Sequence, residues 1–127
     1  MTKILINHKF KSINEYVNQC RTNYYVANKT KQQETMLSAL VFSRIEKINK
    51  YPIELIFNWH MKSKIADLDG RLPKNIIDGL VKAKRIPDDN VKYIQKITHN
   101  YIGDTKDYVE VEIKEMKYNG INKIRKR

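Results

Sequence analysis

The sequence has 127 residues, enough for one hydrophobic core and too few for two ordinary domains, so we expect a single domain over residues 1–127. Its 41% hydrophobic and 31% charged residues exclude a disordered chain, and the absence of a long apolar stretch or secretory signal predicts a cytoplasmic protein with no membrane partner. The net charge of +11 is spread along the chain, which favours nucleic acid over an anionic membrane surface as the partner.

The first half of the chain is expected to hold a strand followed by helices. Lys3 to Asn7 is a short apolar run typical of a strand. Ser12 and Glu15 have the spacing of a capping box, which predicts a helix that begins near Ile13. Pro52 then ends the helical region. The apolar residues expected on one helical face are Ile13, Val17, Cys20 and Tyr24, and then Met36, Leu37, Leu40, Val41, Ile45 and Ile48.

The second half is expected to add one helix and three strands. Alternation over residues 53–60 predicts a strand with one face well buried, and Pro73 starts a helix that runs to about Ala83. Turn residues follow at 86–90. Residues 91–98 and 108–114 then form a hairpin-like pair of strands, and a basic tail occupies about 115–127. The order predicts an α+β fold, a mixed or mainly antiparallel sheet with helices packed on it.

Three aspartates between these elements form the candidate metal site. Asp67 and Asp69 are two residues apart just beyond a strand, so in extended chain both side chains face the same way. Asp89 follows the next helix, and if its turn lies beside the first pair, three carboxylates converge. Oxygen ligands without His or Cys favour Mg²⁺, with Mn²⁺ as a substitute, over zinc. A solvated acidic turn remains the alternative interpretation.

The segment around these aspartates resembles the RusA family of Holliday-junction resolvases. The residues that carry the resemblance are Asp67-Leu68-Asp69-Gly70, then Pro73 to Leu80 with Lys74 and Asp78, then Ile86-Pro87-Asp88-Asp89-Asn90. Phe10 to Tyr16 is also similar to the start of the family pattern, and Val109 to Ile113 fits its last strand. Two departures are Gly70, where the family usually has Asn, and one extra residue between Asp69 and Lys74.

The resemblance implies a RusA-like fold and an enzyme, a crossover junction endodeoxyribonuclease of phage or bacterial type that acts in DNA recombination and repair. It implies a homodimer that makes paired nicks across a four-way DNA junction with magnesium. Asp67, Asp69 and Asp89 would hold the metal, and Lys74 would act on the scissile phosphate or the attacking water. The alternative for Lys74 is a surface pair with Asp78 on the same helix.

DNA contacts are expected from basic residues near the acidic centre, namely Lys62, Lys64, Arg71, Lys82, Lys84 and Arg85. Tyr24 and Tyr25 have the chemistry to stack on unpaired bases, although core or dimer packing is the favoured interpretation. Two other functions stay open: a non-catalytic DNA-binding protein with a resolvase-like fold, which Gly70 and the longer loop would favour, and a less selective nuclease of branched DNA.

Overall fold

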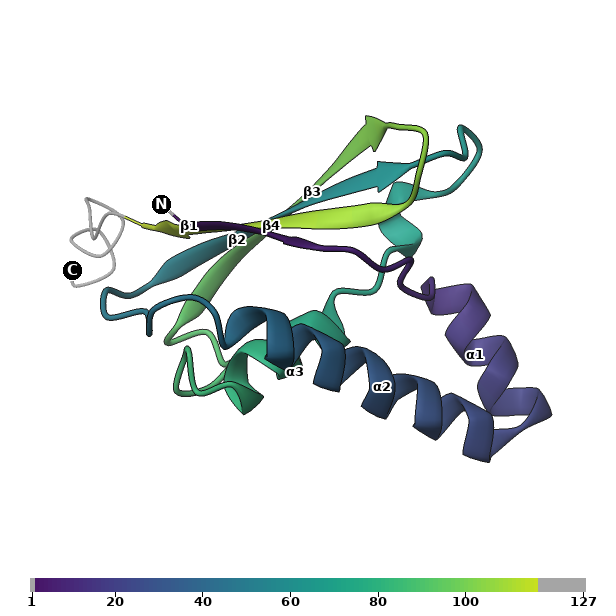
Figure 1. Cartoon of the computed structure of the whole chain (residues 1–127), viewed down its shortest axis with the longest axis horizontal. Coiled ribbons are helices and arrows are strands. Elements are labelled where there is room, and N and C mark those ends of the chain that lie inside the picture. Colours follow the sequence, from purple (N-terminus) through teal and green to yellow (C-terminus); the bar gives the residue numbers. More distant parts are fainter. Residues whose placement is uncertain (1, 117–127) are drawn as a thin grey trace, which may run out of the picture.

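Four strands form one mixed sheet in the order β1-β4-β2-β3 in a computed structural model that describes residues 2–116 (Figure 1). The strands are β1 (Thr2–Ile6), β2 (Ile53–Met61), β3 (Ile94–Gly103) and β4 (Tyr108–Glu115). β2 pairs in parallel with β3 and antiparallel with β4, and β4 also pairs antiparallel with β1. The chain is therefore a small α+β domain with a mixed sheet, as the order of patterns predicted.

The expected hairpin between the last two strands is wrong, because β2 lies between β3 and β4. On their core face, β2 and β4 are the two most apolar strands, and Val109, Val111 and Ile113 of β4 are all buried. The centre of a sheet hides such residues best. β3 has mostly exposed side chains and tolerates the edge. β3 also begins at Ile94 and ends at Gly103, later in the chain than expected.

Three helices accompany the sheet: α1 (Ile13–Thr22), α2 (Tyr24–Phe42) and α3 (Lys74–Lys82). The capping box at α1 is confirmed, since the Glu15 backbone N–H donates to Ser12 Oγ at 3.2 Å and the Ser12 N–H donates to Glu15 Oε1 at 3.1 Å. The second hydrogen bond lowers the pKa of Glu15. The predicted helix after Pro73 is confirmed as α3, which ends at Lys82 and is followed by Lys84 at a positive φ of 58°. There the Arg85 N–H donates to Leu80 O, which closes the last turn.

The core lies between one face of the sheet and helices α2 and α3 (Figure 1). Leu55, Phe57 and Val111 of the sheet pack there with Ile76 and Leu80 of α3, so the predicted buried face of β2 is confirmed. The helices approach closely at Gly79, where an added Cβ would lie 2.5 Å from Ser38 Cβ. The opposite face of the sheet is polar, and Asn58 there donates to the carboxylates of Glu110 and Glu112.

Some expectations for the helical region are corrected. α2 ends at Phe42, so Ile45 and Ile48 pack against the core from a non-helical segment. Met36 and Leu40, expected on the packed face, are exposed. Tyr24 does not belong to α1, because α1 ends at Thr22. The extended backbone of Asn23 separates the two helices and turns Tyr24 away from the expected face.

Two further expectations concern the tail and membranes. Glu115 is the last residue of β4 rather than the start of a tail, and residues 117–127 of the expected tail lie outside the described part of the chain. Among residues 2–116, no helix combines the length and the apolarity that crossing a membrane requires.

Candidate metal and DNA site

The segments that carry the candidate residues leave the sheet at two opposite ends. β1 and β2 run in the same direction, with β4 antiparallel between them. The ends of β1 and β2 and the start of β4 therefore share one end, which we call the Met61 end. We call the other end, where β2 begins, the Ile53 end. A nine-residue strand separates the two ends by roughly 25 Å.

Asp67 and Asp69 lie at the Met61 end, on what we call the acid turn, residues 67–70. The chain there forms a short 3-10 turn, η1 (Leu68–Gly70), which packs against β3. The Gly70 N–H donates to Asp67 O at 3.2 Å, and Arg71 Nε donates to the same oxygen at 3.3 Å. The expectation that this segment is extended is therefore wrong at residues 68–70. Both carboxylates are exposed, and neither has a hydrogen-bond or ion-pair partner among residues 2–116.

Gly70 does not distort the acid turn. Its φ is not positive, and an added Cβ would lie 3.7 Å from Asp67 Cβ, which is ordinary van der Waals contact. The position therefore accepts a larger residue such as Asn. The difference from the RusA pattern at this residue gives no steric reason for a changed turn.

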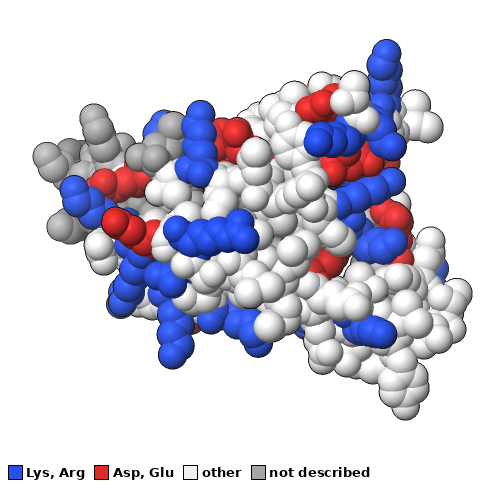
Figure 2. Space-filling model, in the orientation of Figure 1, with Lys and Arg blue, Asp and Glu red and all other residues white. Residues whose placement is uncertain are grey.

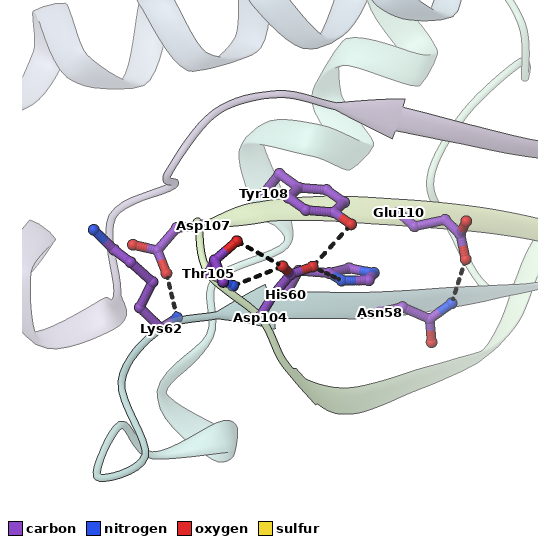
Figure 3. A network of polar contacts seen from close by, with 8 residues as sticks. All are labelled: Asn58, His60, Lys62, Asp104, Thr105, Asp107, Tyr108 and Glu110. Atoms are coloured by element: carbon purple, nitrogen blue, oxygen red, sulfur yellow. Dashed lines mark hydrogen bonds and ion pairs between the residues drawn. The ribbon is translucent and has the colours of Figure 1, made fainter.

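A network of polar contacts fixes the chain where it leaves β2 toward the acid turn (Figure 3). Asp104 Oδ2 accepts from Tyr108 OH at 3.1 Å and lies 2.9 Å from His60 Nδ1. Its Oδ1 accepts from the Thr105 N–H, and these bonds lower the pKa of Asp104, the Thr105 bond most strongly. The Lys62 N–H donates to Asp107 Oδ1 at 2.9 Å. The exit of β2 is thus tied to the loop between β3 and β4.

The sequence pattern does not predict this network. Asp104 and Asp107 stand just before a predicted strand, and His60 stands at the end of another. These places share one end of the sheet only if the two strands run antiparallel in it. The predicted hairpin sets the direction of β4 relative to β3 but not relative to β2, so the sequence pattern alone does not bring these residues together.

A second network positions the start of α3. Glu34 of α2 is buried, and its Oε1 accepts from Asn75 Nδ2 at 3.0 Å. Its Oε2 accepts from the Lys11 N–H at 3.1 Å and lies 3.0 Å from His8 Nε2. The first turn of α3, which carries Lys74, is thereby anchored to α2 and to the segment after β1.

Lys74 itself pairs with Asp78, with 3.7 Å between Nζ and Oδ1. The alternative expectation of a pair on the helix surface is therefore present in the structure. Most of the Lys74 side chain is exposed, and an exposed pair of this kind is weak. Lys74 is thus available for another contact near the start of α3.

Asp89 lies at the Ile53 end and does not meet Asp67 and Asp69 within one chain. The Tyr93 N–H donates to Asn90 O at 3.0 Å, and the Ile53 N–H donates to Tyr93 O at 2.8 Å, which places this turn beside the start of β2. The expected convergence of three aspartates is therefore not found. Residues 2–116 contain no group of three or more His, Cys, Asp or Glu side chains placed to hold a metal ion. The cause is the β2-α3-β3 crossover, whose helix carries the chain back to where β2 began.

The expected DNA-contacting residues are divided in the same way. Lys62, Lys64 and Arg71 lie near the acid turn at the Met61 end. The remaining three, at the end of α3 and just after it, lie at the Ile53 end, where the Ile48 N–H donates to Arg85 O. Figure 2 shows Lys and Arg side chains spread over one face, with Asp and Glu side chains among them at the right. The idea that all six flank one acidic centre is wrong for a single chain. The residues at the Ile53 end are Lys82, Lys84 and Arg85.

Comparison of the sequence with protein-family models and with curated proteins finds no match.

Proposed function

We propose that this protein is a magnesium-dependent endonuclease that acts on branched DNA, with the RusA-like chemistry that its motifs resemble. The observation that carries the proposal is the acid turn. Two exposed carboxylates stand there that have no cationic partner among residues 2–116, on a strongly basic protein and close in sequence to Lys62, Lys64 and Arg71. Carboxylates held open to solvent next to phosphate-binding cations suit a site that receives a metal ion together with DNA.

The donor set at the acid turn fits magnesium. Mg²⁺ commonly binds one or two carboxylates, keeps several waters and takes further oxygens from the phosphates of its substrate. Asp67 and Asp69 would therefore supply its first protein ligands when DNA is present, and Asp89 could add a third only from a second copy of the chain. When bound, the ion would lower the pKa of a water and neutralise charge on the phosphate. The lysines and Arg71 would hold the DNA backbone, and the Asp104 network would keep the exit of β2 in place.

The test is incubation of an end-labelled four-way junction with the full-length protein, with Mg²⁺ or with EDTA. We expect cuts only with the metal, while gel-shift binding persists in EDTA because cations on the protein hold the phosphates. Cutting that is undiminished in EDTA would refute the metal site. A flap substrate and a plain duplex, run in parallel, measure how selective the nuclease is for four-way DNA.

A second candidate function is DNA binding without cleavage. The observation that favours it is that the described residues of one chain hold no cluster of three potential metal ligands. The same gel separates the two functions, because a non-catalytic protein binds the junction but leaves it uncut at every metal concentration. In that case the Asp67→Asn variant would behave as wild type does, binding the junction without cutting it.

A further inference from the structure

A helical arm extends away from the sheet (Figure 1). We define the arm as residues 13–33, which comprise α1 and the first half of α2. α1 has no buried residue, and Ala27 is the only buried residue in the part of α2 that belongs to the arm. An element with so little burial adds little to the stability of the core. Its exposed side chains are therefore available for a partner.

Two tyrosines stand at the tip of the arm. Asn23 Oδ1 accepts from the Val26 N–H at 3.2 Å, which fixes the start of α2. Tyr24 and Tyr25 are the first two residues of that helix, and they are 70% and 85% exposed. Of the expected core or dimer packing, packing in the core is thus wrong, and packing between two copies stays an alternative that the experiment below tests. Aromatic rings usually bury much of their area, so a pair left in solvent at the end of an arm indicates a contact surface.

The charge of the arm selects the kind of partner. Between Glu15 and Glu34 the sequence has no acidic residue, while it has Arg21, Lys29 and Lys31. Such a surface attracts a polyanion. A second copy of the chain would bring the same basic arm, so electrostatic repulsion opposes contact between two arms, whatever other surfaces a dimer uses.

A groove of about 500 Å³ lies between α2 and α3, and its first lining residue on α2 is Asn28. Tyr24, Asn28, Lys31 and Thr35 follow one another at helical spacings of four, three and four residues, so they form one stripe that runs from the tip into the groove. Neither Lys31 nor Lys82 has an ion-pair partner in the described part of the chain, whereas Asp78 is paired with Lys74. The residues that line the groove are Asn28, Lys31, Gln32, Thr35, Met36, Asp78 and Lys82.

We propose that this stripe, together with Tyr25 at the tip and Lys82 of α3 across the groove, binds a DNA strand at a place where its bases are unpaired. Tyr24 and Tyr25 stack on the bases, and Lys31 and Lys82 contact the phosphates. Every base has a π-face, so stacking requires unpaired bases but no particular sequence. The proposal rests on the proposed function, and it names the structural feature of the DNA that the protein recognises. Amide side chains such as Asn28 add donors and acceptors along the same stripe.

The test measures binding by fluorescence anisotropy in EDTA, so that cleavage plays no part. The probes are a branched DNA with a short single-stranded gap at the branch point and a duplex of equal length. A 2-aminopurine base in the gap reports stacking directly. The variants are Tyr24→Ala/Tyr25→Ala and Tyr24→Phe/Tyr25→Phe. Tyr101→Ala is the matched control, because Tyr101 is also exposed, at 43%, but lies on β3.

We expect the double alanine variant to bind the gapped probe about tenfold more weakly or worse, with a duplex affinity within about twofold of wild type. The phenylalanine variant and Tyr101→Ala should retain binding, and wild type should quench the 2-aminopurine. An alanine variant equal to wild type, or an equal loss on both probes, overturns the proposal. A smaller particle mass for the double alanine variant than for wild type in light scattering also overturns it, because the tyrosines would then join two copies of the chain. A wild-type protein that binds neither probe overturns the proposed function as well.

Discussion

At the scale of single residues, the acid turn carries the two carboxylates on which the proposed chemistry depends. Asp67 and Asp69 lack partners among the described residues, so removing either charge costs the fold little. The same feature would leave both carboxylates free to bind a cation. Substitution there should therefore separate catalysis from stability.

We predict that Asp67→Asn and Asp69→Asn each lower the rate of junction cutting on the order of 100-fold or more. Junction binding should stay equal or become stronger, because each change removes negative charge near the DNA. Single-turnover cleavage in Mg²⁺ and gel shifts in EDTA give the two readouts. Glu46→Gln, an exposed acid at the Ile53 end, is the control and should cut at the wild-type rate. Wild-type cutting by both aspartate variants would remove the acid turn from the mechanism.

His99 gives the fold a dependence on pH. Trp59 Nε1 donates to His99 Nδ1 at 2.9 Å, and burial lowers the pKa of this histidine below its ordinary value of 6.5. Protonation would remove the acceptor and place a charge in a largely apolar site. The stability that neutral His99 provides is therefore fully present above pH 6.5, and is lost as pH falls from 6.5 through the lowered pKa.

We predict that the free energy of unfolding, measured with urea between pH 7.5 and pH 5, falls less steeply with decreasing pH in His99→Gln than in wild type. The neutral glutamine keeps an acceptor but does not titrate in this range. The comparison cancels the contributions of all other titratable groups, because the two proteins share them. Parallel pH profiles for the two proteins would show that His99 does not contribute to the pH dependence.

At the scale of elements, the contact between α2 and α3 sets the orientation of the helix that carries Lys74. Gly79 permits this contact, since an added Cβ would lie 2.5 Å from Ser38 Cβ and 2.9 Å from the backbone nitrogen of Ala39. A backbone atom cannot move aside as a flexible side chain can. The helices would have to separate, and the buried residues around Ser38 would lose contact.

We predict that Gly79→Ala lowers the free energy of unfolding by about 1–2 kcal/mol. Overpacking costs roughly 1–3 kcal/mol, and the better helix propensity of alanine recovers up to about 1 kcal/mol. Urea denaturation measures the change. Gly70→Ala is the control, because its added Cβ makes ordinary contact and should leave stability within about 0.5 kcal/mol. A Gly79→Ala protein as stable as wild type would mean that the two helices can separate without loss.

At the scale of the whole molecule, the separation of Asp67 and Asp69 from Asp89 constrains the assembly. The two groups lie at opposite ends of β2, so Asp89 can join the acid turn only from a second copy of the chain. A homodimer is also the simplest way to make two symmetric cuts in one junction. We therefore predict a particle of about 30 kDa by light scattering, twice the chain mass of 15.1 kDa. A monomer, with and without junction DNA, would favour single nicks.

The role of Asp89 is tested by subunit mixing. We predict that Asp69→Asn and Asp89→Asn homodimers are both inactive, but that a heterodimer with one subunit of each makes a single nick. In that heterodimer one site combines an intact acid turn with the intact Asp89 of the other subunit. The two variants carry different tags and are co-expressed, and two successive affinity steps isolate the heterodimer. Nicking of a labelled junction by this heterodimer is then measured. An inactive heterodimer would place Asp89 in the same chain as its acid turn, and an active Asp89→Asn homodimer would exclude it from the site.

The sequence by itself determined the parts that depend on near neighbours in the chain. The capping box at Ser12, the alternation of β2, and the apolar face of the helix after Pro73 each place a regular element correctly. Hydrogen bonds at helix ends and side-chain periodicity act over a few residues, so the pattern carries the whole signal. Asp88 and Asp89 likewise lie in the turn that Pro87 and Asn90 predict, where the Asp89 N–H donates to Asp88 Oδ1.

The tertiary structure decided which of these parts meet. β2 took the place beside β4 that the sequence order assigned to β3, and Asp89 returned to the far end of β2 from Asp67 and Asp69. Tyr24 and Tyr25, which have the composition of core residues, remained in solvent. Strand order, crossover direction and burial result from competition among all apolar surfaces of the chain for one core. A local sequence pattern does not show which apolar surfaces will be buried together, so strand order and burial are decided only in the assembled fold.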